Sequence, residues 1–178
     1  MNVILIGFMG CGKSTLGIRL SYRMKQPYID TDKYIEKQED MLIKDIFATK
    51  GEEEFRRIET GVLENLLETE LKNHVISTGG GMPTRVENHE LLKKLGVVVW
   101  LRIKPETVIE RLEGDTTRPL LQGDNPQARI EELLSVRTPL YEACSDVVVD
   151  VDNKPIEKIM DEIFTKAGGV WKKKKKMR

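Results

Sequence analysis

Residues 7–15 constrain this chain more than any other segment, because they match a complete phosphate-binding loop pattern. They read Gly-Phe-Met-Gly-Cys-Gly-Lys-Ser-Thr, which satisfies G-x-x-x-x-G-K-[ST]. Residues 3–6 before the loop predict a buried strand, and residues 16–20 after it predict the start of a helix. Backbone amides and a helix N-terminus in this arrangement form an anion site, which Lys13 and the Ser14 hydroxyl can complete with contacts to phosphate and Mg²⁺. The alternative interpretation is a plain glycine-rich turn.

Length and charge narrow the class of protein. The chain has 178 residues, a length that suits one domain with a substantial core. Its net charge is zero, but residues 172–176 and Arg178 hold six of the 29 basic residues, which leaves 23 basic against 29 acidic residues elsewhere. An acidic body argues against nucleic-acid binding, so small molecules are the expected partners.

The cysteines and the apolar runs bear on the cellular location. Cys11 and Cys144 are too few for a framework of disulfides or metal ligands, and Cys11 lies inside the phosphate loop. We therefore expect a reducing, cytoplasmic compartment. The first apolar run stops at Gly7 and the longest later run, residues 97–101, is too short to cross a bilayer, so no signal peptide and no membrane partner are expected. A monomer is expected because no apolar interface pattern is obvious.

Five short apolar runs alternate with helical stretches along the chain. They cover residues 2–6, 27–30, 74–78, 97–102 and 146–151. Runs that are apolar throughout suit strands buried on both faces, and strands separated by helices imply parallel pairing. We therefore predict an α/β protein, with a three-layer α/β/α arrangement around a central five-stranded parallel sheet. Ligands of such sheets bind beyond the carboxyl ends of the strands.

Two segments break the alternation. Residues 112–125 have glycines near both ends, a proline inside and no clean period, which predicts a mobile lid; a passive surface loop is the alternative. The basic run at the end of the chain is typical of a solvated, disordered terminus. We thus predict one domain over residues 1–168, with the lid inside it and a disordered basic tail over 169–178.

Acidic residues follow the second predicted strand. Asp30 ends that strand and is the expected partner of Ser14 at Mg²⁺, with Asp150 and Asp152 as competitors at the end of the fifth strand. Asp32 lies two residues further on, and in an extended stretch both side chains would point into the cleft. Asp32 could orient a substrate hydroxyl and accept its proton, or it could cap the helix expected to begin near Lys33.

Basic and glycine residues complete the candidate site. A helix is predicted to begin at Gly51, and within it Arg56 and Glu59 are three residues apart and can pair, while Arg57 is expected to face solvent. Gly79, Gly80 and Gly81 follow the third strand, where they either allow a close approach of backbone to a ligand or form a simple turn. Arg118 and Arg137 are, by themselves, ordinary surface residues.

Taken together, these motifs resemble the shikimate kinase family, a group of P-loop kinases related to the nucleoside monophosphate kinases. The resemblance extends over roughly residues 1–165. Its most specific parts are Asp-Thr-Asp at 30–32, Phe-Arg-Arg-Ile-Glu at 55–59, Gly-Gly-Gly at 79–81 and Arg-Pro-Leu-Leu at 118–121, and Arg-Thr-Pro-Leu-Tyr at 137–141 also matches.

This resemblance implies a reaction and a set of residue roles. The family transfers the γ-phosphate of ATP to the 3-hydroxyl of shikimate, a step of aromatic amino acid biosynthesis, with Mg²⁺ as cofactor. It implies catalytic roles for Lys13, Asp32 and Arg118, and Mg²⁺ binding by Ser14 and Asp30. Shikimate binding is implied for Asp32, Arg56, Glu59, Gly79, Gly80, Gly81 and Arg137. ATP binding is implied for Gly10, Cys11, Gly12, Lys13, Ser14, Thr15, Arg111 and Arg118 and, on a looser match, for Asn153, Lys154 and Pro155.

Three other functions are alternatives to the shikimate kinase interpretation. A gluconate-type sugar-acid kinase would share the loop and the fold but gives no reason for the Phe-Arg-Arg-Ile-Glu and Arg-Pro-Leu-Leu motifs together. A nucleotide-switch protein is disfavoured because Ile156 replaces the acid of an Asn-Lys-x-Asp motif and no Asp-x-x-Gly occurs. A catalytically silent relative is disfavoured because every proposed catalytic residue is present.

Overall fold

The computed structural model describes residues 1–112 and 125–176. The predicted lid therefore lies almost entirely outside the described residues, as does Arg118. The described part contains one five-stranded sheet, formed by β1 (Val3–Ile6), β2 (Tyr28–Asp30), β3 (Val75–Ser77), β4 (Val97–Arg102) and β5 (Val147–Asp150). All four pairings between neighbouring strands are parallel, and the strand order is β2-β3-β1-β4-β5. The predicted strands and their parallel arrangement are confirmed.

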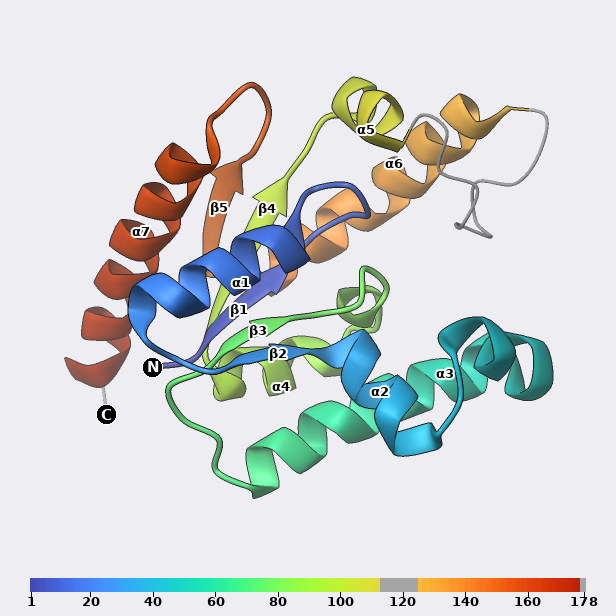
Figure 1. The fold of residues 1–178 in the computed structure, drawn as a ribbon, viewed down its shortest axis with the longest axis horizontal. Helices are drawn as coiled ribbons and strands as arrows, with labels where there is room; N and C mark the ends of the chain where they lie inside the picture. The colour runs from blue at the N-terminus through green and yellow to red at the C-terminus, as the bar shows by residue number, and fades with distance from the viewer. Residues whose placement is uncertain (113–124, 177–178) are drawn as a thin grey trace.

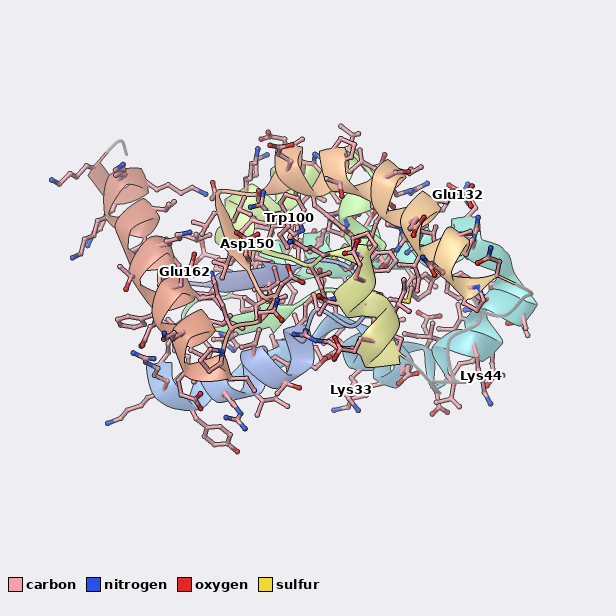
Figure 2. The ribbon with its side chains drawn as sticks, turned by 90° about the horizontal axis from the view of Figure 1, so that it is seen from above. Lys33, Lys44, Trp100, Glu132, Asp150 and Glu162 are labelled. Atoms are coloured by element: carbon pink, nitrogen blue, oxygen red, sulfur yellow. The ribbon has the colours of Figure 1, made fainter. Side chains whose placement is uncertain are left out.

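Helices cover both faces of this sheet (Figure 1). The helices α1 and α7 contact each other on one face, while α3, α4 and α6 pack together on the other. The helix bounds are α1 (Lys13–Met24), α2 (Thr31–Glu39), α3 (Ile43–Glu68), α4 (Glu87–Leu95), α5 (Pro105–Leu112), α6 (Pro126–Cys144) and α7 (Ile156–Lys176), with a 3₁₀ turn η1 (Met82–Thr84). Seen from above, α7 with Glu162 lies at one end of the molecule, and Lys44 on α3 with Glu132 on α6 lies at the other (Figure 2).

The core explains why the strands read as continuous apolar runs. Every residue of β1 and β3 is buried, as are the first five residues of β4. Strands covered on both faces have no exposed side on which polar residues could alternate, so apolar side chains fill nearly every position. This rigid sheet holds the loops that leave its carboxyl edge.

The phosphate loop has the backbone shape that its glycines predict. Gly10 and Gly12 have φ values of 77° and 90°, in the left-handed region that residues with a Cβ adopt at a cost. Gly12 directly precedes α1, so the loop passes from β1 into the helix without a side-chain cap on the first amides. Those amides are therefore left for a ligand.

The kink in α3 and the end of α7 bear on two sequence predictions. α3 consists of two helical segments that meet at a kink at Gly51, whose φ of 82° and ψ of 169° are non-helical, so the helix predicted to begin at Gly51 is present and an additional segment from Ile43 precedes it. The tail predicted as disordered is helical over its described part, because α7 continues to Lys176. Val170 and Trp171 pack against the core and hold this last part of α7 on the protein body. Among residues 1–112 and 125–176, none of the helices has both the length and the hydropathy that crossing a bilayer requires.

Candidate active site

A cleft of about 420 Å³ opens at the carboxyl ends of β1, β2 and β3. Its walls come from the phosphate loop, the starts of α1 and α2, the middle of α3, the loop after β3, and α6. The lining residues include Lys13, Ser14, Asp30, Asp32, Arg56, Glu59, Gly79, Gly80, Gly81 and Arg137. The structure thus brings the predicted phosphate site and the predicted acceptor site into one cavity.

Lys13 forms the phosphate end of the cleft. Its Nζ donates to the carbonyl oxygens of Gly7 at 2.8 Å and Phe8 at 3.0 Å, so the ammonium lies folded over the loop. Because Lys13 is also the first residue of α1, its charge adds to the positive end of the helix dipole. This end of the cleft is suited to a polyanion.

Asp30 lies beside this phosphate end and accepts four hydrogen bonds. Oδ2 accepts from the hydroxyls of Ser14 and Tyr28, each at 3.2 Å, and Oδ1 accepts from the backbone amides of Asp32 at 3.1 Å and Lys33 at 3.4 Å. Asp30 is therefore the N-cap of α2. The predicted alternative role of Asp32 as the helix cap is wrong, because α2 begins two residues earlier than expected.

Asp32 reaches the cleft by a different geometry from the predicted one. We predicted that an extended stretch would point Asp30 and Asp32 in the same direction. The extended segment instead ends at Asp30, and Asp32 lies in the first turn of α2. A Cβ built on Gly79 would lie 2.5 Å from Asp32 Oδ1 and 2.8 Å from Glu59 Oε1. The two carboxyl groups therefore meet at the Cα of Gly79, which is possible because that residue has no side chain.

Two carboxylates hold the Arg56 side chain in place on α3. One of them belongs to Glu59, as the three-residue spacing predicted. Its Nη1 donates to Glu59 Oε2 at 2.7 Å and its Nη2 to Glu52 Oε1 at 2.9 Å. A Cβ on Gly81 would lie 2.0 Å from Arg56 Nη1, so the guanidinium lies against the backbone of this glycine. Arg57, whose side chain is 66% exposed, faces solvent as predicted.

Glu59 is the most unusual group of the cleft, since its side chain carries a carboxylate into the core. The residue has 0% exposure, and Oε1 has no hydrogen-bond partner among the described residues. Burial raises the pKa of Glu59 from 4.5 to about 7, although Arg56 and Arg137 act in the opposite direction; the nearby Asp32 adds to the increase.

Arg137 enters the cleft from α6 and is supported by the next turn of the same helix. It is 9% exposed, and its guanidinium carbon lies 5.6 Å from the ring centroid of Phe8. One turn later, the Tyr141 hydroxyl donates to the carbonyl oxygen of Gly80 at 2.7 Å. Burial raises the pKa of Tyr141 to about 12, so this phenol stays a neutral donor and fixes the glycine loop against α6.

A phosphate loop and an arginine pair facing a carboxylate on one sheet edge match a known family. The shikimate kinase family model matches residues 9–167. The chain belongs to the shikimate kinase family. It is 45% identical over 162 residues to the shikimate kinase of Thioalkalivibrio sulfidiphilus, covering 91% of this chain and 84% of that protein. It is 40% identical over 163 residues to that of Caldanaerobacter subterraneus subsp. tengcongensis, covering 92% and 94%.

Solved structures agree with this family assignment. The shikimate kinase of Acinetobacter baumannii in complex with shikimate has a TM-score of 0.85 and 36% identity, covering 92% of this chain and 90% of that one. The shikimate kinase of Aquifex aeolicus has a TM-score of 0.81 and 37% identity, covering 95% and 97%. A gluconokinase of Sinorhizobium meliloti has a TM-score of 0.60 at 18% identity, which shows a shared fold alone.

The residues implied for the nucleotide base are only partly brought together. Arg111 and Lys154 line a pocket of about 300 Å³ beside the phosphate loop, with Gly10, Cys11, Gly12 and Thr15. Arg111 also donates to the carbonyl oxygens of Gly10 at 3.0 Å and Val151 at 3.2 Å. Asn153 and Pro155 are not among the lining residues of either pocket.

The competitors for Mg²⁺ lie apart from the cleft. Asp150 forms a bidentate ion pair with Arg102, in which Arg102 Nη2 donates to Asp150 Oδ2 at 3.0 Å. Asp152 accepts a hydrogen bond from the backbone amide of Lys104 at 3.1 Å. Neither lines the cleft, whereas Asp30 does. The structure therefore favours Asp30 over both.

Several residues support the site in ways that the sequence did not predict. Tyr28 and Tyr141 hold Asp30 and Gly80, and the buried Thr31 hydroxyl accepts from the Gly79 amide at 3.0 Å. The partners in the last two hydrogen bonds are 61 and 48 residues apart in the sequence, so no local sequence pattern predicts these contacts. Ile43 and Phe47, from the turn of α3 that precedes the predicted helix, add an apolar wall to the cleft.

Proposed function

We propose that this chain is a kinase that transfers the γ-phosphate of ATP to the 3-hydroxyl of shikimate. The observation that carries the proposal is one cleft with a phosphate loop at one end and Arg56, Arg137 and Asp32 at the other. Shikimate is a small polyol carboxylate. Two arginines suit its carboxylate through charge-assisted hydrogen bonds, and an aspartate suits its hydroxyls.

The residue roles follow from this placement. Lys13 and the amides of residues 10–15 hold the phosphates. Arg56 and Arg137 bind the acceptor carboxylate, Glu59 positions Arg56, and the backbone of Gly79, Gly80 and Gly81 closes the pocket between them. Asp32 orients the acceptor hydroxyl toward the γ-phosphate and takes its proton. Arg111 with Lys154, and more loosely Asn153 and Pro155, border the nucleotide base.

The donor set beside the phosphate loop fits Mg²⁺. The Ser14 hydroxyl and the Asp30 carboxylate are 3.2 Å apart, and both are hard oxygen ligands. No cluster of three His, Cys, Asp or Glu side chains able to hold a metal occurs among the described residues, as expected for a cation that keeps most of its contacts with water and nucleotide phosphates. Bound there, Mg²⁺ would neutralise charge on the β- and γ-phosphates during transfer.

Arg118 and the lid remain proposals from the sequence. Arg118 lies outside the described residues, and we propose that it meets the charge that develops on the transferring phosphoryl group. We likewise propose that residues 112–125 close over the cleft, that the enzyme acts as a monomer in the cytoplasm, and that neither nucleic acid nor membrane is a partner.

A coupled ADP-release assay with Mg²⁺-ATP tests the proposed reaction. The purified protein should release ADP when shikimate is added, and not with gluconate or without an acceptor. Equal turnover with gluconate would support the sugar-acid kinase instead. Absence of turnover with any acceptor would support a catalytically silent relative.

A further inference from the structure

A second cavity lies at the opposite end of the sheet from the active site. It has a volume of about 520 Å³ and opens where β1 and β4 begin, beside the ends of α3, α4 and α7. Figure 1 shows the N-terminus and the last turns of α7 at this side of the molecule, whereas α5 lies at the other. The volume falls within the roughly 300–1,000 Å³ that is usual for small-molecule sites.

The floor of this cavity is fixed by a buried amide. Asn2 is 3% exposed, and its Nδ2 donates to the carbonyl oxygens of Leu71 at 2.7 Å and Leu95 at 2.8 Å. Its Oδ1 accepts from the backbone amide of His74 at 3.1 Å. One side chain thus ties together β1, the turn before β3 and the end of α4, so the cavity is framed by rigid elements.

The end of α7 supplies one wall. Trp171, Lys174 and Lys175 line the cavity, and their spacing of three and four residues places them on one face of the helix. Lys172 and Lys173 are exposed and do not line it. The lysines of the basic run therefore lie on two faces of α7, and only the face with Lys174 and Lys175 borders the cavity.

The cavity combines an apolar interior with an excess of positive charge. Its apolar lining includes Leu66, Leu67, Leu71, Leu95 and Trp171. Lys174 is neutralised by Asp146 at 2.7 Å, and Glu70, which is the acidic residue of the lining, forms an exposed ion pair with Lys72 at 3.4 Å. Within the described part of the chain, Lys94 and Lys175 have no carboxylate partner, and Lys93 donates to the Ala143 carbonyl oxygen at 2.9 Å.

We propose that this cavity binds a small carboxylate with an apolar, ring-sized body. The leucines and the Trp171 ring would bury the body, since aromatic and aliphatic surfaces favour a flat apolar ligand. The lysine ammonium groups at the rim would bind the carboxylate, which the apolar interior alone would exclude. This site is separate from the one in which shikimate is proposed to bind, so it does not depend on the proposed function.

Titration with 3-phenylpropanoate, followed by NMR, tests the proposal. Saturating shikimate is present throughout, so that the probe carboxylate does not occupy the active-site arginines. We expect saturable shifts of the Trp171 indole N–H and of the methyl groups of Leu66, Leu67 and Leu95. The uncharged analogue 3-phenylpropan-1-ol and acetate should each bind at least about tenfold more weakly, because each lacks one half of the recognised ligand.

Two paired charge reversals separate the cavity from general charge. The double variant Lys94→Glu with Lys175→Glu should weaken 3-phenylpropanoate binding by about tenfold or more. The matched variant Lys172→Glu with Lys173→Glu changes the charge equally on the outer side of α7 and should bind within about twofold of wild type. Thermal unfolding and basal ADP release confirm that both variants are folded.

Three outcomes would overturn the proposal. They are the absence of saturable shifts at this cavity, equal weakening by the two double variants, and equal binding of the alcohol or of acetate.

Discussion

Replacing Glu59 with glutamine should make the protein more stable at alkaline pH. The wild-type residue is fully buried, and burial raises its pKa from 4.5 to about 7. Because the folded-state pKa lies above the unfolded value, ionisation of Glu59 opposes folding as the pH rises. The difference corresponds to roughly 3 kcal/mol, at about 1.36 kcal/mol for each pKa unit. This loss should develop between about pH 4.5 and about pH 7 and then stay constant.

Urea unfolding of wild type and Glu59→Gln at several pH values measures this effect. Glutamine has the same shape and no charge, so it resembles the protonated glutamic acid at every pH. We expect the stability of the variant relative to wild type to increase by about 3 kcal/mol from about pH 4 to about pH 8. Comparing the two proteins at each pH removes the contribution of all other titrating groups.

The same variant should lose affinity for the acceptor. Glutamine gives Arg56 a neutral hydrogen-bond acceptor in place of a carboxylate 2.7 Å away, so the guanidinium would be held less firmly. The shikimate KM should rise while the ATP KM stays close to wild type. If the stability of both proteins changes in parallel with pH, Glu59 titrates like an exposed carboxyl and the argument from burial is wrong.

Two further predictions separate the acceptor site from the metal site. Gly81→Ala should push Arg56 away, because the new Cβ would lie 2.0 Å from Nη1; losing one charge-assisted contact of about 2 kcal/mol lowers shikimate kcat/KM about thirtyfold. The matched control Gly61→Ala meets nothing within 4 Å in α3, so kinetics that fall equally in both variants would contradict this assignment. Asp30→Asn should keep the cap of α2, since asparagine also caps helices, and should regain activity at high Mg²⁺ in a Mg²⁺ titration. Asp32→Asn should show no such rescue, and the reverse pattern would exchange the two roles.

The sheet was predictable from sequence because its signals are local. The central strands β1, β3 and β4 are short, mostly apolar runs, because burial on both faces requires apolar side chains along a strand; the edge strands β2 and β5 are only partly buried. The phosphate loop and the Arg56–Glu59 pair are local as well, because a turn or a helix fixes the distance between residues a few positions apart. These features follow from spacing along one segment.

The remaining features depend on segments that meet only in the folded chain. The insertion of β3 between β1 and β2 is a matter of topology, and it determines that the loop at residues 79–81 borders both the phosphate loop and α2. The bond from Tyr141 to Gly80 and the docking of Trp171 on the core arise in the same way. The helical end of α7 was missed because a lysine run alone resembles a solvated tail, and the packing of Val170 and Trp171 outweighs that preference.

Glu59 and the glycine loop show why this site is built at a cost to stability. A buried carboxylate with one unpartnered oxygen is destabilising, and glycines in a loop add conformational entropy to the unfolded chain. Both serve the same geometry, because Glu59 and Glu52 hold the two guanidinium nitrogens of Arg56, and the missing side chain of Gly81 leaves room for that guanidinium. Asp32 and Glu59 in turn can approach each other only across a residue without a side chain, Gly79. A more stable arrangement would separate these charges, and with them the groups that are proposed to bind both ends of the acceptor.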